Sequence, residues 1–124
     1  HIPKTVSVIA GLKAIRSLLK DKKRWTQYAS ARYNNEESCS ARSSRASCWC
    51  LTGAMTALLP IEEQYNMVKN RLDDEVVGNG YISDIQNFND HYSHQDVIKT
   101  LSNAIKKKTT PEEKKVYRQL IKQK

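Results

Sequence analysis

The chain has 124 residues and a formal net charge of +8, and 39% of its residues are hydrophobic. This length predicts one domain whose core needs no metal or disulfide, and three cysteines exclude a framework in which every cysteine is paired. The odd cysteine count favours a reducing, cytoplasmic location, and no apolar run reaches the ~18 residues of a membrane span, so we expect no membrane contact.

Two helices are expected before the polar middle of the chain. Apolar residues spaced by four, three and four between 5 and 20 predict an amphipathic helix that Thr5 or Ser7 caps. Residues 25–32 predict a short second helix. From 33 to 47 no periodicity remains, which indicates a long polar loop, and loops of this length are either functional or mobile.

The stretch 48–59 carries no charge and predicts the buried central helix. Its apolar residues fall on nearly every side at helical spacing, so other helices should surround it. We expect Ser47 to cap this helix and Pro60 to follow its end. Gly53 allows a neighbouring helix to approach closely, at a cost of ~1 kcal/mol relative to alanine.

More helices are expected after Pro60. Apolar spacing predicts a helix over 61–72, before an acidic surface run at 73–75 and a turn at 76–80. Two further helices are expected to start at caps, a short one after a capping box at 83–86 and a longer one after Ser93. The last helix starts at 110–113, where a threonine cap, a first-position proline and a capping glutamate follow one another.

The fold class is therefore all-α, with about six helices around 48–59, and the alternative is an α fold with a small hairpin within 33–45. We expect a core domain over 1–105, with 106–124 as a basic amphipathic helix packed on it or appended to it. The chain begins at His1 rather than Met, which is typical of a piece of a longer protein.

Several short motifs follow one another in a characteristic order between Val8 and Ile105. They are Leu18-Leu19, Trp25-Thr26-Gln27, Ala31-Arg32, Trp49-Cys50-Leu51 with Gly53-Ala54, Phe88-Asn89-Asp90 and His94-Gln95-Asp96-Val97-Ile98. This order resembles an uncharacterised family of small bacterial and phage helical proteins, built around a Trp-Cys-x-x-Gly-Ala helix and a following Asn-Asp pair. The resemblance implies a one-domain helical fold and supplies no catalytic residue.

Four side chains are candidate zinc ligands: Cys48, Cys50, His91 and His94. Structural zinc sites usually have two to four residues between paired cysteine ligands, and only one residue separates Cys48 from Cys50. If both cysteines are helical, their side chains point ~200° apart, too far to share one ion. Buried cysteines are the simpler interpretation. We therefore expect no metal and no other cofactor.

A thiol enzyme is the second alternative function. Cys50, as the third residue of a helix, would have a lowered thiol pKa, with His94 as base and Asn89 or Asp90 orienting it. Against this, Cys50 would face the small apolar side of the helix, which implies burial. We therefore favour a protein that is not an enzyme.

The charge is divided into basic, acidic and basic blocks, with +7 over 1–59, −5 over 60–100 and +6 over 101–124. The candidate binding surface consists of Lys22, Lys23, Arg24, Arg32, Arg42 and Arg45. The leading hypothesis is a protein-interaction or accessory module, of phage or effector type, that acts through this surface on an unknown protein partner. Backbone-directed nucleic-acid binding is the alternative, although aromatic residues are not regularly interleaved with these bases in the sequence.

Overall fold

The computed structural model describes residues 7–81 and 84–122, and within them helices dominate. The helices are α1 (Val8–Leu19), the 3₁₀ turn η2 (Lys22–Arg24), α2 (Leu51–Leu58), α3 (Glu62–Gly78), α4 (Ile85–His91), α5 (His94–Lys106) and α6 (Pro111–Lys122). None of the described helices is both long enough and apolar enough to cross a bilayer. The mostly helical fold class predicted from the apolar spacing is confirmed.

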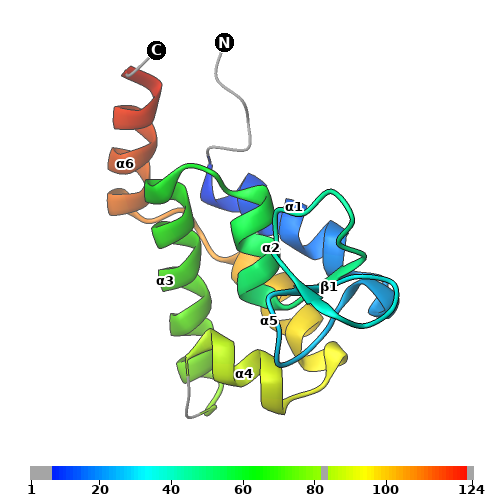
Figure 1. The fold of residues 1–124 in the computed structure, drawn as a ribbon. Coiled ribbons are helices and arrows are strands. Elements are labelled where there is room, and N and C mark those ends of the chain that lie inside the picture. The colour runs from blue at the N-terminus through cyan, green and yellow to red at the C-terminus, as the bar shows by residue number, and fades with distance from the viewer. Residues whose placement is uncertain (1–6, 82–83, 123–124) are drawn as a thin grey trace.

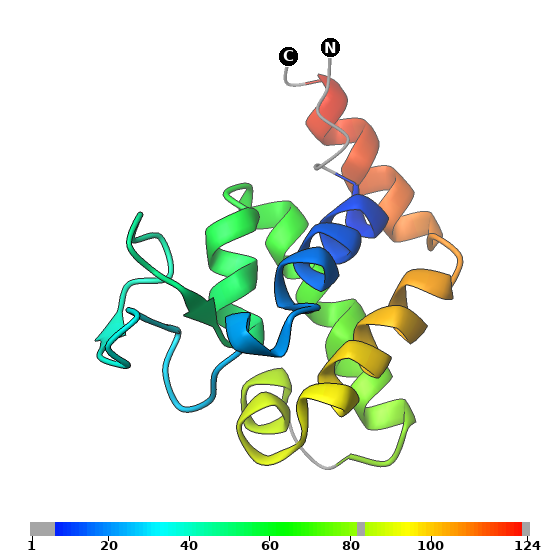
Figure 2. The same ribbon diagram turned by 90° about the vertical axis from the view of Figure 1, so that its right-hand side faces the viewer.

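The core forms where α1, α2, α3 and α5 pack together (Figures 1 and 2). Leu12, Ile15 and Leu19 form the buried stripe of α1, and each is fully buried. Leu51 and Met55 of α2 are equally buried, whereas Thr52, Thr56 and Leu58 are half-buried, so one side of the uncharged stretch lies in the core and the prediction of burial on nearly every side is met only in part. Burial of one such side chain adds about 1.5–3 kcal/mol to the free energy of unfolding.

A small antiparallel sheet projects from one side of the helices, opposite the corner where α6 extends (Figure 2). Its strands are β1 (Ala31–Arg32), β2 (Ser38–Cys39) and β3 (Cys48–Trp49), in the order β2-β1-β3. We name residues 30–50 the β-cap. The predicted hairpin alternative is therefore close to the observed structure, with its turn at 33–37 and a third strand added.

The predicted helix over 25–32 is wrong. Backbone and side-chain groups of this segment bond to distant residues instead of to each other. Thr26 N donates to Trp49 O at 3.0 Å, and Gln27 Nε2 donates to the carbonyls of Asn89 and Tyr92, each at 3.0 Å. These tertiary bonds hold the segment in a bent, non-helical path and override its local helix preference.

The central helix is shorter than predicted, because Cys48 and Trp49 pair with β1 in the sheet. The cap is Cys50, whose Sγ accepts from Gly53 N at 3.2 Å, and Ser47 is not the cap. The close approach at Gly53 is made by the backbone at Ser30 and not by a helix, since a Cβ on Gly53 would lie 1.8 Å from Ser30 O.

The other predicted helix starts and ends agree with the structure, with two exceptions. Ser7 caps α1, and Ser93 caps α5 in a capping box with Asp96. The helix predicted to stop before the 73–75 run continues through it to the end of α3. The proposed capping box at 83–86 includes Ser83, which lies outside the described residues, and Asp84 is the cap observed for α4.

Candidate functional site

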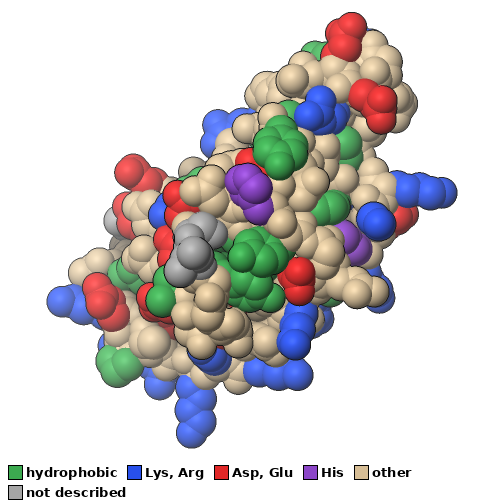
Figure 3. Space-filling model, turned by 90° about the horizontal axis from the view of Figure 1, so that it is seen from below, with side chains coloured by type: hydrophobic (Ala, Val, Ile, Leu, Met, Phe, Trp, Pro, Cys, Tyr) green, Lys and Arg blue, Asp and Glu red, His purple; other side chains and the backbone are tan. Residues whose placement is uncertain are grey.

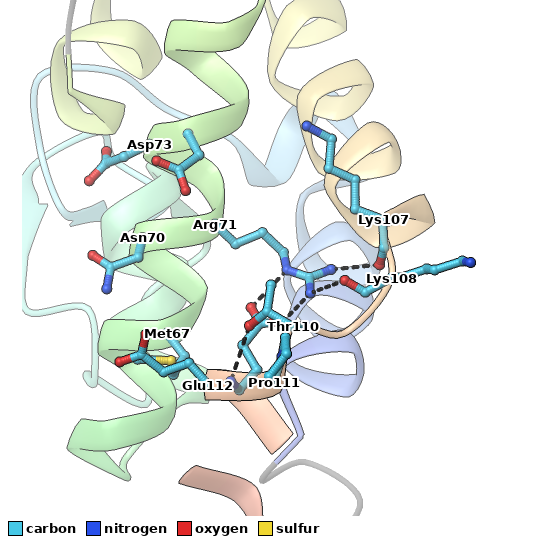
Figure 4. A pocket seen from close by; sticks show the side chains of 11 residues that line it. Met67, Asn70, Arg71, Asp73, Lys107, Lys108, Thr110, Pro111 and Glu112 are labelled. Atoms are coloured by element: carbon cyan, nitrogen blue, oxygen red, sulfur yellow. Dashed lines mark hydrogen bonds and ion pairs between the residues drawn. The ribbon is translucent and has the colours of Figure 1, made fainter. Parts of the chain in front are cut away.

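A cleft of about 910 Å³ lies between α3 and the link from α5 to α6 (Figure 4). Arg71 points into it from α3. The guanidinium donates to the carbonyls of Ala104, Lys107 and Lys108 at 2.9–3.1 Å, and also to both carboxylate oxygens of Glu113. These contacts use all five donors of the side chain.

Glu113 completes this contact from the first turn of α6. It is 6% exposed, and its carboxylate also accepts from Thr110 N at 2.9 Å in a reciprocal cap. Burial alone would raise the pKa of Glu113, but the hydrogen bonds from Arg71 and Thr110 hold it below its ordinary value. We name Arg71, Thr110 and Glu113 the α6 clasp. Because the polar groups of the clasp are engaged with each other and with nearby backbone carbonyls, this cleft holds a structural contact.

The Asn-Asp pair also has a structural role. Oδ1 of Asn89, which is fully buried, accepts from Trp25 Nε1 at 2.7 Å and from Leu51 N at 3.0 Å, and Nδ2 donates to Thr26 O at 3.1 Å. Asp90 accepts from Tyr28 N at 2.9 Å. Burial would raise the pKa of Asp90, but hydrogen bonds, led by that from the Tyr28 backbone, lower it.

The candidate catalytic thiol is enclosed. Cys50 has no exposed surface, and its Sγ lies within hydrogen-bonding distance of Gly53 N and of Thr52 Oγ1. His94 packs against Trp25 with ring centres 5.6 Å apart, and its Nε2 donates to Leu19 O at 2.6 Å. Both groups are therefore occupied by structural contacts, which weighs against the thiol-enzyme hypothesis.

The candidate metal ligands lie in different settings. Cys48 is half-buried in β3, Cys50 is enclosed, and His91 is exposed at the end of α4 with Nδ1 2.9 Å from Asn87 O. Among the described residues, no three His, Cys, Asp or Glu side chains lie close enough together to hold a metal ion.

Two clefts adjoin on the β-cap and share Tyr33, Asn34 and Ser47 in their walls. The first cleft, of about 520 Å³, is also lined by Lys22, Lys23, Trp25, Thr26, Arg32, Glu36 and Cys48. The second cleft, of about 460 Å³, is also lined by Asn35, Ser44, Arg45 and Ala46. We name the two clefts together the β-cap groove. It brings η2, the β1–β2 turn and the loop before β3 to one place.

Arg45 and Tyr33 meet in this groove. The guanidinium carbon of Arg45 lies 5.2 Å from the centre of the Tyr33 ring, within the range of a cation–π contact. Arg45 is exposed and Tyr33 is half-buried, so the pair is accessible from solvent. Aromatic and cationic groups that are apart in the sequence are therefore adjacent in the fold.

Four of the six predicted surface residues line the groove. Lys22, Lys23 and Arg45 are exposed there, whereas Arg32 donates to Thr26 Oγ1, Glu36 O and Gln27 O and so holds the groove wall in place. Arg42 is directed elsewhere, with Nε 3.3 Å from Thr56 O at the end of α2. Arg24 is exposed at the end of η2 and is not among the lining residues.

The sequence prediction missed Tyr33, Asn34, Asn35 and Glu36. They form the turn between β1 and β2, and Glu36 there has a left-handed φ of 71°. Two consecutive asparagines in a polar stretch are a turn signal, which would have placed a hairpin turn here and its side chains at one edge.

A second exposed feature lies where residue 28 meets α4. Tyr28 is 67% exposed with a φ of 65°, and its ring packs edge-on against His91 with centres 6.0 Å apart. Figure 3 looks at the molecule from below α4. Histidine and hydrophobic side chains gather in the middle of this face, and Lys and Arg side chains project from its edges.

Comparison with known proteins gives one match. A family model described as a family of unknown function matches residues 3–107. No curated protein and no solved structure matches the chain. The matched region contains the β-cap groove and the Asn89 contacts, and it ends before α6.

Proposed function

The chain belongs to DUF6197, a family of unknown function, and we propose that it is a non-enzymatic binding module whose β-cap groove holds the phosphate backbone of a nucleic acid. The observation that carries this proposal is the meeting of cations and an aromatic ring in one groove. Lys22, Lys23 and Arg45 supply positive charge there, and Tyr33 lies between the two clefts.

The groove has the chemistry that phosphates require. Lysine ammonium groups and an arginine side chain neutralise phosphate charge, and their contacts release counterions into solution. Asn34, Ser44 and Ser47 add neutral polar groups along the same path. Glu36 is the acidic residue among the groove-lining side chains, and it opposes anion binding at the first cleft.

The net charge supports the same partner. At +8 the protein attracts polyanions over distances of about 10 Å at 0.1 M salt. In the sequence the aromatic residues do not alternate regularly with the bases, which is unfavourable for nucleic-acid binding. In the fold Tyr33 and Arg45 are in contact, which supports the proposal.

Electrophoretic retardation with a labelled oligonucleotide tests the proposal. Three cations that contact phosphates predict a log–log salt slope between about −2 and −3, so binding at about 50 mM salt should weaken strongly by about 200 mM. The Lys22→Gln/Lys23→Gln variant should bind less tightly and show a shallower slope. Lys114→Gln/Lys115→Gln removes the same charge from exposed positions on α6 and should keep most of the binding.

Two results would reject the proposal. One is no retardation at micromolar protein in low salt. The other is equal weakening by the groove variant and the α6 variant, because that would assign the binding to net charge alone and not to the groove.

Protein docking at Tyr28 is the second candidate function, and it keeps the interaction-module hypothesis. A bulky residue in the left-handed region costs about 1–3 kcal/mol and is concentrated at functional sites. Asp90 holds the Tyr28 backbone in this conformation, which leaves the ring exposed beside His91. Exposed tyrosines are frequent contact residues in protein interfaces.

A photo-crosslinking amino acid at position 28 tests this second candidate. A specific crosslinked protein that is lost with His91→Ala and kept with Lys22→Gln/Lys23→Gln would support docking at Tyr28. Crosslinks of equal yield in all variants would reject it.

The cellular location proposed for this activity is a reducing compartment such as the cytoplasm. Cys39, Cys48 and Cys50 are free thiols in the structure, and two of them are only half-buried. Exposed free thiols persist in reducing compartments.

A further inference from the structure

The two clefts of the β-cap groove form one path with Tyr33 at the junction. Tyr33, Asn34 and Ser47 belong to both clefts, so a ligand that fills one cleft reaches the other without leaving the surface. The cations are divided between them, with Lys22 and Lys23 in the first cleft and Arg45 in the second. A ligand that fits this path carries negative charge and has a flat group between its charges.

The Tyr33–Arg45 pair supplies a flat stacking surface. Arg45 lies over the ring at 5.2 Å, and guanidinium and phenol groups both bind the faces of nucleobases. The second cleft adds the side chains of Asn34, Asn35 and Ser44 around this pair. Asn35 Oδ1 already accepts from Glu37 N at 3.1 Å, which fixes the turn and not the ligand.

A stacking surface selects single strands over duplexes. In a duplex each base face is covered by its neighbours, so a protein that relies on stacking binds bases that are unpaired and splayed out. A groove that acted through phosphates alone would bind both forms. The presence of an accessible Tyr–Arg pair in the same groove as Lys22 and Lys23 therefore favours single strands.

We propose that the ligand of the β-cap groove is a single-stranded nucleic acid, with one base stacked on the Tyr33–Arg45 pair and its neighbouring phosphates at Lys22 and Lys23. This inference rests on the proposed function and adds the strand form and the stacking residue. Binding is sequence-tolerant, because every base offers a flat face.

Fluorescence anisotropy with three labelled probes tests the inference: a 12-mer of deoxythymidine, a 12-mer of uridine and a 12-base-pair DNA duplex. The wild-type protein should bind the single strands at least tenfold more tightly than the duplex at the same salt concentration. Comparing the two single strands shows whether the sugar matters, and either order of the two is compatible with stacking.

Tyr33 variants separate stacking from charge. Tyr33→Leu should weaken single-strand binding about tenfold and leave duplex binding unchanged, whereas Tyr33→Phe keeps the ring and should bind like wild type. Arg45→Lys keeps the charge and loses the flat guanidinium, so it should also weaken single-strand binding, and it replaces the leucine variant if that variant fails to fold. Matching thermal melts of the variants establish that the fold is kept.

The failures of the two proposals look different. Equal binding of single strands and duplex, with no effect of Tyr33→Leu but weaker binding by Lys22→Gln/Lys23→Gln, would overturn the stacking inference and leave the phosphate groove intact. No binding of any probe would overturn both.

Discussion

The indole Nε1 of Trp25 donates to Oδ1 of Asn89 at 2.7 Å, across 64 residues of sequence. The same oxygen accepts from Leu51 N, so one amide side chain joins the segment before β1, the start of α2 and α4. This contact anchors the chain that leads into the β-cap. The groove therefore depends on a buried polar residue that does not itself touch a ligand.

Replacing Asn89 should destabilise the whole domain. Asn89→Ala leaves Leu51 N, which is buried, and Trp25 Nε1 and Thr26 O, which are part-buried, without these hydrogen bonds, and a buried unsatisfied group costs about 1–3 kcal/mol. We expect a loss of about 2 kcal/mol or more in the free energy of unfolding, measured with urea. Asn87→Ala, at an exposed position of the same helix, should change it by less than about 0.5 kcal/mol. Similar values for both variants would show that the Asn89 contacts are dispensable.

Two glycine replacements should have opposite effects. A Cβ at Gly53 would lie 1.8 Å from Ser30 O, so Gly53→Ala must displace backbone of the β-cap or of α2. We expect it to prevent folding or to lower the melting temperature strongly. At Gly78 a Cβ meets nothing within 4 Å, and Gly78→Ala in the last turn of α3 should be neutral or stabilise by up to about 1 kcal/mol. A stable Gly53→Ala protein would contradict the close contact.

The α6 clasp should be destabilised by loss of the Glu113 charge. Glu113→Gln leaves the Arg71 charge buried and unpaired, which should cost about 3–5 kcal/mol. Glu112→Gln, at the exposed neighbouring position, is the matched control and should have little effect. A Glu113→Gln protein as stable as Glu112→Gln would contradict the explanation by an unpaired buried charge.

Acid should weaken the fold in a defined range. The pKa values of Glu75, Asp90 and Glu113 are all lowered in the folded protein. A lowered pKa contributes stability that is fully present above the unfolded value, about 4 for these groups, and lost as the pH falls through the folded value. The free energy of unfolding should therefore decrease below about pH 4, and the decrease should be smaller in Glu113→Gln. If the free energy of unfolding of Glu113→Gln falls with acid as steeply as that of the wild type, Glu113 does not contribute to this pH dependence.

The helical part of the fold was predictable because its signals are local. The stripe of Leu12, Ile15 and Leu19 repeats within one helix, and the caps at Ser93 and Thr110 lie within three residues of their partners. The resemblance to an uncharacterised family was also correct, since DUF6197 covers residues 3–107.

The β-cap was not predictable in the same way. Residues 25–30 are held out of a helix by Asn89 and Tyr92, which follow more than 60 residues later, and no local pattern reveals such partners. The cations of the groove were recognised from their charge. Their position next to Tyr33 depends on the turn at 33–37 and on the loop that returns Arg45 to it, and both are properties of the folded sheet.

The most direct test is to map the binding surface by NMR, which suits a 14.2 kDa protein. Amide signals should be followed while an unlabelled 12-mer of deoxythymidine is added to the labelled protein. We predict that the largest shifts fall on Lys22, Lys23, Tyr33, Asn34 and Arg45, with little change along α6. Shifts concentrated on α6, or spread evenly over all basic residues, would contradict the assignment of function to the β-cap groove.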